Sequence, residues 1–536
     1  MEASGIHYLE LILILLLVFV VGFGSLARRL RTPYPIILVI TGLLVSLLPA
    51  MPNISLNPDI VFLGFLPPLL FAAAFTTSWR DFKYNLVSIC FLAFGLVGFT
   101  VFGVAAAARW ILPGFDWRTG LVLGAVVATT DAIAATSIGK NLGLPKRIID
   151  VLEGESLIND ASGLLALEFT VALVVSGNRP SVAEGAGRLL YLLFGGIAVG
   201  LIIGKIVYWF ESYIDDAPIE ITVSIITPFM AYLAAESLHS SGVLATVACG
   251  LYLGRQSATY FSSQSRIEAD AVWNTLTFVL NGIVFILIGL QLPIILASIK
   301  AYAFHNLILR AAIMTALVIA LRLAWIYPGA HVSYFIRNKL LGQNEPIPSP
   351  RAIFVVGWTG MRGVVALAAA ISLPEVLDNG SSFPQRSVIL FMTFCVIFVT
   401  LVVQGLTLPA LIRRLGLAGV PSDNSEEEEA RRAMILAALK DLEAREAKAN
   451  PELRPIYEDL AMHYQRRLAS LSSQDKRGEG EISPQQYRTY RDVAQELRKI
   501  EYATAIELRN RNKINDEVLR TLQRELDLSE ARAGDS

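Results

Sequence analysis

The chain has 536 residues, of which 54% are hydrophobic, and its formal net charge at pH 7 is −1. This near-neutral charge gives no reason to expect nucleic-acid binding. The three cysteines stand singly in apolar runs with no CxxC pair, which excludes a disulfide framework and a cysteine metal site. Long apolar runs fill residues 6–415, whereas residues 421–536 are rich in Glu, Arg, Lys and Gln. We therefore predict a membrane domain over residues 1–415 and a helical tail over residues 421–536.

The apolar runs of the first part are long enough to cross about 30 Å of hydrocarbon as α-helices. They predict an all-α, polytopic membrane protein with about 13 transmembrane helices. The expected ranges are residues 6–26, 34–50, 59–77, 86–112, 118–138, 148–176, 187–211, 219–238, 241–256, 270–297, 304–335, 351–374 and 386–412.

The positive charges between these runs predict the orientation of the chain. Fifteen Lys and Arg residues lie in joints expected to be cytoplasmic, namely Arg28, Arg29, Arg31, Arg80, Lys83, Lys140, Lys146, Arg147, Arg255, Arg266, Arg337, Lys339, Arg351, Arg413 and Arg414. Six lie in joints expected to be external, namely Arg109, Arg118, Arg179, Arg188, Lys300 and Arg386. This bias predicts an external N-terminus and a cytoplasmic tail. The acidic joint at residues 211–220 is the one cytoplasmic joint that does not contribute to the bias.

Residues 151–169 combine an apolar run with several carboxylates and are the first candidate for a functional site. A charge at the centre of a bilayer costs roughly 2.5–3.5 kcal/mol on insertion scales, so these acids are not expected to face lipid. Ser156 and Asp160 are four residues apart and share a helical face, with Asn159 beside them. Such oxygen ligands suit a hard cation, and a carboxylate in a partly dry site can also take a proton.

Two further stretches carry polar residues or glycines at corresponding places in the two halves of the membrane domain. Residues 357–366 (GWTGMRGVVA) contain three glycines and an Arg in an apolar run, and residues 127–135 contain Asp131. If spans 1–6 and 8–13 form two inverted repeats, both stretches belong to the fifth span of a repeat. Interrupted spans at matching positions indicate a transporter site, because irregular backbone at membrane depth is tolerated where it lines a cavity.

The polar tail is expected to be helical. Ser425 and Glu428 fit a capping box, which predicts a helix to about Lys448. Further helices are predicted over residues 452–472 and from Ser483 to about Leu528. The tail is expected to pack as a small helical domain or to dimerise.

At residues 154–160 (GESLIND) and 360–363 (GMRG) the chain resembles the monovalent cation:proton antiporters of the sodium/proton exchanger type, and the resemblance runs over most of residues 10–415. The likeness is to bacterial members with an Asn-Asp pair and a cytoplasmic helical tail. Supporting stretches are residues 66–71, 130–131, 241–245, 280–281 and 289–292.

The resemblance implies a role for each matching residue. Asp160 is the essential carboxylate that binds cation or proton, and Asn159 is its neutral partner, associated with electroneutral exchange. Asp131 and Thr130 complete the site, and Ser156 offers a hydroxyl ligand. The monovalent cation is expected to be held by Asp160, Asp131 and Ser156.

The resemblance also implies a structural ion pair between Glu155 and Arg362 across the two bundles. Spans 4–6 and 11–13 are expected to form a moving core, and spans 1–3 and 8–10 a dimer scaffold. Ala132 stands where relatives often have Pro, and no helix breaker occurs between Gly124 and Gly139, so the broken fifth helix follows from the resemblance alone.

The function so implied is secondary antiport of a monovalent cation for a proton. Na⁺ is the first candidate for the cation, and K⁺ and Li⁺ are alternatives. One site reached alternately from each side binds either ion, so no cofactor is expected. The exchange is expected to be electroneutral, to serve intracellular pH and cation homeostasis, and to take place in the plasma (inner) membrane by a homodimer.

Other charged residues of the apolar runs have structural interpretations. Arg322 is interpreted as a residue that caps or pairs with a carbonyl group, Glu236 as a residue near a membrane edge, and His239, His305 and His331 as interfacial. An intramembrane aspartyl protease also needs two membrane aspartates, here Asp131 and Asp160, but Asp131 lacks the Gly-Asp context of that class. A cation channel needs a filter of repeated subunits, and no filter-like run is present.

Overall fold

The computed structural model describes residues 2–30, 32–48, 54, 56–175, 182–299, 303–343, 346–377, 380–419, 425–447, 450 and 454–471, with residues 500, 501, 503, 504, 507 and 511. The chain divides into two compact units, Met1–Val420 and Pro421–Ser536, and each is described by itself. The division falls where the composition changes from apolar to charged.

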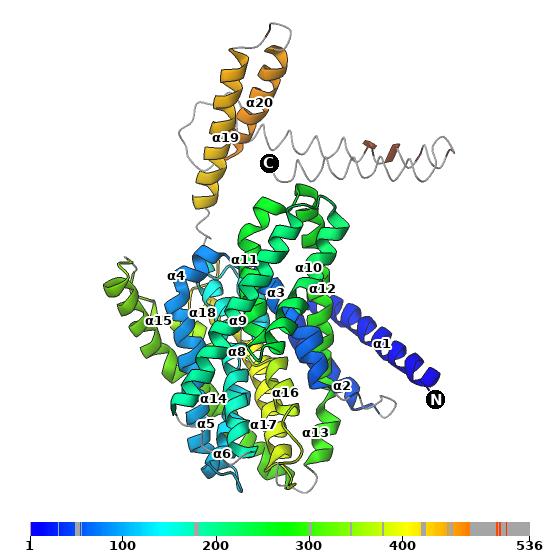
Figure 1. Cartoon of the computed structure of the whole chain (residues 1–536), viewed down its shortest axis with the longest axis vertical. Coiled ribbons are helices and arrows are strands. Elements are labelled where there is room, and N and C mark those ends of the chain that lie inside the picture. The colour runs from blue at the N-terminus through cyan, green and yellow to red at the C-terminus, as the bar shows by residue number, and fades with distance from the viewer. Residues whose placement is uncertain are drawn as a thin grey trace. The chain divides into compact units, whose positions relative to one another are not determined.

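The first unit is built from helices throughout its described part, which confirms the predicted all-α class (Figure 1). In chain order, with π-helical turns marked η, they are α1 (Glu2–Arg29), α2 (Tyr34–Ser46), η1 (Ile60–Phe65), α3 (Leu66–Thr76), α4 (Trp79–Cys90), η2 (Phe91–Leu96), α5 (Val97–Ile111), α6 (Trp117–Ala128), α7 (Ile133–Asn141), α8 (Lys146–Val175), α9 (Val182–Glu211), α10 (Ala217–Ser237), α11 (Gly242–Tyr260), α12 (Ser263–Leu290), α13 (Leu292–Ser298), α14 (Phe304–Phe335), η3 (Ile336–Leu340), α15 (Pro350–Trp358), α16 (Val364–Ile371), α17 (Arg386–Val399), η4 (Thr400–Gln404) and α18 (Gly405–Arg414).

Nine helical segments among the described residues are long and apolar enough to cross a membrane, and Tyr34–Ser46 and Ile60–Thr76 are shorter apolar helices. Each of the thirteen expected ranges overlaps a helical segment. The multi-pass character is therefore confirmed, while the count of 13 crossings stays a prediction.

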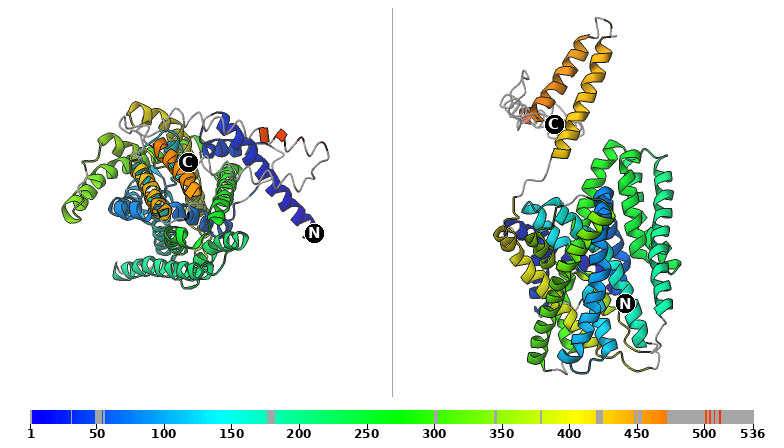
Figure 2. Two further views of the ribbon diagram at one scale, coloured as in Figure 1. Left: turned by 90° about the horizontal axis from the view of Figure 1, so that it is seen from above. Right: turned by 90° about the vertical axis from the view of Figure 1, so that its left-hand side faces the viewer.

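The helices of the first unit pack as two groups. One contains α4 to α8 and α14 to α18, and the other contains α1, α2, α3 and α9 to α12. We call them the core group and the scaffold group. α1 extends from the edge of the scaffold group, against α2 and α12 (Figures 1 and 2). The groups meet along α8, α16 and α3, so α8, with its carboxylates, lies at their boundary.

Two of the expected spans in the core group, residues 118–138 and 351–374, are each interrupted and consist of two short helices. α6 ends at Ala128 and α7 begins at Ile133, with Thr129 in an extended conformation between them. α15 ends at Trp358 and α16 begins at Val364. The backbone N–H of Asp131 donates to the carbonyl of Met361 at 2.8 Å, so the two interruptions lie against each other. The interrupted helices expected from the resemblance are present, although no proline or glycine breaks α6 from α7.

The second unit contains α19 (Ser425–Glu446) and α20 (Arg454–Leu471) in its described part. These two helices pack against each other, as Figure 1 shows. Both lie within about two residues of the predicted ranges. The third predicted helix, from residue 483 to about 528, falls mostly outside the described residues.

Candidate functional site

A cavity of about 480 Å³ lies between the core and scaffold groups. Its lining extends from Lys140 and Arg266, in joints predicted to be cytoplasmic, to Asp131 and Asp160 deep between the helices. Lys140 forms an ion pair of 2.8 Å with Glu153, which also lines the cavity. Residues of both helix interruptions, 129–133 and 363–365, therefore line one cavity that reaches one end of the bundle.

The carboxylate of Asp160 lies on this cavity, and only 8% of the residue is exposed. No hydrogen bond to this carboxylate occurs among the described residues, and Asp131 is near enough to repel it electrostatically. A buried carboxylate ordinarily needs a hydrogen-bond donor or a positive charge. Asp160 is thus the acid that an incoming cation or proton can reach and neutralise.

Asp131 lies in the interruption between α6 and α7 and also lines the cavity. Its Oδ1 accepts a 2.8 Å hydrogen bond from the backbone N–H of Ile133, so the side chain caps the first turn of α7. This cap explains how the chain leaves α6 and restarts as α7 without a proline. The second carboxylate oxygen takes no part in that cap.

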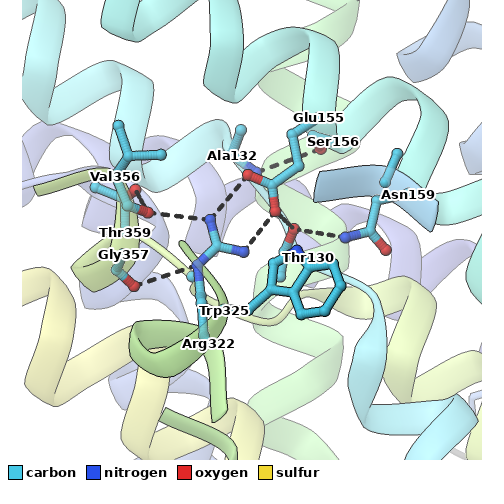
Figure 3. Close-up of polar contacts among 12 residues, drawn as sticks. Thr130, Ala132, Glu155, Ser156, Asn159, Arg322, Trp325, Val356, Gly357 and Thr359 are labelled. Atoms are coloured by element: carbon cyan, nitrogen blue, oxygen red, sulfur yellow. Dashed lines mark hydrogen bonds and ion pairs between the residues drawn. The ribbon is translucent and has the colours of Figure 1, made fainter. Parts of the chain in front are cut away.

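Ser156 and Thr130 also line this cavity. The Ser156 hydroxyl accepts a 3.4 Å hydrogen bond from the backbone N–H of Ala132 (Figure 3). With Asp131 and Asp160 they make a set of oxygen donors, the kind that hard cations prefer. Among the residues that the structure describes, no group of three or more His, Cys, Asp or Glu side chains could hold a metal ion, so the set does not resemble a transition-metal site.

Asn159 differs from the other predicted site residues because it does not line the cavity. Its amide nitrogen donates to the Thr130 hydroxyl at 3.1 Å, and that hydroxyl donates to the Glu155 carboxylate at 3.1 Å (Figure 3). Asn159 therefore holds Thr130 in position from behind the cavity wall.

Glu155 forms its ion pair with Arg322, which corrects the predicted pair with Arg362. The distances from the Arg322 nitrogens to the two carboxylate oxygens are 2.5 and 2.8 Å, and both residues are 1% exposed (Figure 3). The pair with Arg362 was implied by the family resemblance at residues 360–363. Arg322 is on the long α14, which passes next to α15, and its guanidinium reaches Glu155 from there.

The two buried arginines also stabilise the carbonyl ends of the interrupted helices. Arg322 donates to the carbonyls of Gly357 at 3.2 Å and Val356 at 3.1 Å, at the end of α15. Arg362 donates to the carbonyl of Val127 at 3.2 Å, at the end of α6, and to the carbonyl of Gly360. Helix ends leave carbonyls unpaired and carry partial negative charge, so each guanidinium caps one half-helix. The interpretation of Arg322 as a residue that caps carbonyl groups is confirmed. Its ion pair with Glu155 was not predicted.

Gly363 lets the two interruptions approach closely. A Cβ atom on this glycine would overlap the Asp131 carboxylate, and one on Gly360 would overlap the Arg322 side chain. Side chains at these positions would push apart the two breaks that carry the site.

A second cavity, of about 300 Å³, lies on the other side of Asp160 along α8. Ala161, Ser162 and Glu168 line it, whereas Ser156, Leu157 and Asp160 line the first cavity. Glu168 forms an ion pair of 3.2 Å with Arg188 of α9, which joins the two helix groups there. The linings of the two cavities thus meet on α8 at the consecutive residues Asp160 and Ala161.

Sequence reasoning did not identify the scaffold residues of the site. Phe71, Trp273 and Asn281 line the first cavity opposite the carboxylates, and the rings of Phe71 and Trp273 lie 5.5 Å apart. Asn281 is a polar residue inside an apolar run, a signal that could have marked it.

The sequence profile described as "Sodium/hydrogen exchanger, transmembrane" matches residues 14–414. The chain is 32% identical to an uncharacterised Na⁺/H⁺ exchanger of Mycobacterium tuberculosis, over 97% of this chain and 96% of that protein. It is 34% identical to a sodium, potassium, lithium and rubidium/H⁺ antiporter of Bacillus pumilus, over 76% of this chain and 62% of that protein.

Among solved structures, the chain is similar to the sodium proton antiporter MjNhaP1 of Methanocaldococcus jannaschii. The TM-score is 0.58 at 20% identity, and the match covers 77% of this chain and 99% of the other. This likeness supports the antiporter fold. Because the family and the relatives are transporters, the aspartyl protease interpretation is set aside. The match over residues 14–414 and the similarity to these relatives show that the chain belongs to the sodium/hydrogen exchanger family, whose members exchange cations for protons across membranes.

Proposed function

We propose that the protein exchanges a monovalent cation for a proton at Asp160, with Na⁺ as the first candidate and K⁺ or Li⁺ as alternatives. The observation that carries this proposal is the Asp160 carboxylate, which lines the cavity without a hydrogen-bond partner in the described structure. Both buried arginines nearby are engaged by Glu155 or by carbonyl groups, so they leave the charge of Asp160 uncompensated.

Cation and proton compete for this one carboxylate. When Asp160 releases its proton, its oxygens become cation ligands, and Asp131, Ser156 and Thr130 supply further oxygens from the same cavity. When the proton returns, the charge that held the cation is lost. This competition couples the two flows, because the site crosses the membrane neutralised by one ion or the other.

Alternating access follows from the two cavities on either side of Asp160. The first extends to joints predicted to be cytoplasmic, so this conformation is an inward-facing one. Movement of the core group against the scaffold group would close it and connect the second cavity to the site. The Glu168–Arg188 ion pair joins the two groups on that second side and would have to separate.

The exchange is electroneutral in this proposal, because Asn159 cannot titrate and leaves Asp160 as the acid that changes charge. The name of the Bacillus pumilus relative includes four cations, which supports keeping K⁺ and Li⁺ as candidates. We propose that the protein works as a homodimer in the plasma membrane, with its tail in the cytoplasm, in pH and cation homeostasis.

The test is cation exchange driven by a pH gradient in everted vesicles, with Na⁺, K⁺ and Li⁺ each in turn. Asp160→Asn should abolish exchange of every cation while the protein still inserts. Asp150→Asn is the matched control: Asp150 lies on the same helix but does not line the cavity, so exchange should persist. Normal exchange by a folded Asp160→Asn variant would refute the assignment of the site.

A further inference from the structure

We propose that Glu211 and Glu220 form a second proton-binding site, located in the scaffold group and separate from Asp160. Glu211 is the last residue of α9, and Glu220 lies in the first turn of α10. The two glutamates therefore lie on either side of the short connection between these helices, which we call the corner. Glu211 is 1% exposed and Glu220 is 0% exposed. These residues bound the one acidic joint that does not follow the charge bias of the cytoplasmic side.

Neither carboxylate has a partner in the described structure. All four side-chain oxygens are buried without a hydrogen bond, and no Lys, Arg or His of the described chain forms an ion pair with them. The groups that face Glu211 are Glu220 of α10 and Tyr260 and Cys249 of α11. None of these neighbours carries a positive charge, and neither Tyr260 nor Cys249 donates a hydrogen bond to a carboxylate oxygen of the pair.

A buried carboxylate without a partner costs several kcal/mol, and two such charges also repel each other. A proton on one of them removes one of the two charges and the repulsion between them, and it needs no added space. A metal cation would need several more oxygen ligands, and neither glutamate lines either of the two cavities described above. A proton is therefore the ligand that this corner fits.

The helix ends indicate which carboxyl group holds the proton. Glu220 lies near the N-terminus of α10, where the helix dipole stabilises a negative charge. Glu211 lies at the C-terminus of α9, where the dipole opposes one. Glu211 is therefore the proton carrier of the pair.

The pair belongs to a packed region that reaches the transport cavity. Tyr260 and Cys249 lie in one apolar cluster with Phe71, and Phe71 lines the cavity beside Asp131 and Asp160. Ionisation of both glutamates would put two like charges inside this cluster, and the corner of α9, α10 and α11 would have to open to water. The site therefore makes scaffold packing depend on pH.

Thermal unfolding of the full-length protein in detergent, from pH 5 to pH 9, tests the site. A carboxyl group that keeps its proton when folded but loses it when unfolded costs stability as pH rises. Glu211→Gln and Glu220→Gln should each unfold close to wild type at pH 5 and above wild type at pH 8.5. Asp215→Asn, an exposed acid at the same corner, should follow wild type at every pH.

Infrared spectroscopy assigns the proton. The C=O stretch of a protonated carboxyl group should be lost at pH 7 in Glu211→Gln and kept in Glu220→Gln. Two results would overturn the proposal. The first is that both glutamine variants are less stable than wild type at high pH. The second is that added Na⁺ or K⁺, at constant ionic strength, stabilises the wild-type protein and that Glu211→Gln alone abolishes this stabilisation. The latter would mean that the corner holds a metal cation. Neither readout depends on exchange at Asp160.

Discussion

The guanidinium of Arg322 holds both carboxylate oxygens of Glu155, at 2.5 and 2.8 Å, although the two residues are 167 positions apart in the chain. The pair joins α14 to α8, the helix that carries Asp160. Through Thr130 it also reaches the interruption between α6 and α7, because the Thr130 hydroxyl donates to the same carboxylate. One buried ion pair thus connects the helices that build the site.

Removal of one partner should destabilise the protein strongly. Glu155→Gln leaves the Arg322 charge buried without its carboxylate, which typically costs about 3–5 kcal/mol. The double variant Glu155→Gln with Arg322→Gln should recover part of that loss in thermal unfolding. As a control, Arg362→Gln combined with Glu155→Gln should show no such recovery. Recovery with Arg362 and not with Arg322 would restore the pair expected from the resemblance.

Addition of a methyl group at Gly363 should reduce exchange. Its Cβ would overlap the Asp131 carboxylate, so Gly363→Ala must displace either that carboxylate or α16. Such overpacking costs about 1–3 kcal/mol, and we expect at least a tenfold fall in exchange rate in vesicles. Gly98→Ala in α5 is the control, since a Cβ there meets no atom within 4 Å. Equal rates for the two variants would show that the contact is not needed.

Removal of the tail should leave ion coupling intact. The lining residues of both cavities lie in the unit that ends at Val420. Truncation after Val420 should therefore preserve exchange in vesicles, with a shift in its pH dependence or weaker dimers in detergent. Loss of exchange at every pH in a correctly inserted truncated protein would make the tail part of the transport machinery.

The exchange rate should not respond to membrane potential. One proton exchanged for one monovalent cation moves no net charge, whereas each charge that crosses 100 mV is worth about 2.3 kcal/mol. The measurement is Na⁺/H⁺ exchange in proteoliposomes with the potential clamped at several values by valinomycin. A rate or end-point that follows the imposed voltage would mean unequal charge movement, and Asp131 would become the leading candidate for a second proton carrier.

The amino-acid sequence by itself determined the membrane class, the positions of the helices and the acids of the site. Hydropathy and the cost of a charge in lipid act on each segment locally, so they can be read from the order of residues. Asp160, Asp131, Ser156 and Thr130 were all identified in this way or from the resemblance, and all line one cavity.

The tertiary structure decided which buried groups meet. Arg322 and Arg362 are both arginines in apolar runs, and only the path of α14 beside α15 determines that Arg322 reaches Glu155. Asn159 is adjacent to Asp160 in sequence, yet it points behind the cavity, because neighbours on a helix are about 100° apart around its axis. The break at Thr129 likewise lies where tertiary contacts form, among them the hydrogen bond from the Asp131 backbone N–H to the Met361 carbonyl, and no breaking residue marks it in the sequence. Partners of buried polar groups depend on how distant helices cross, and the local pattern of residues does not encode that crossing.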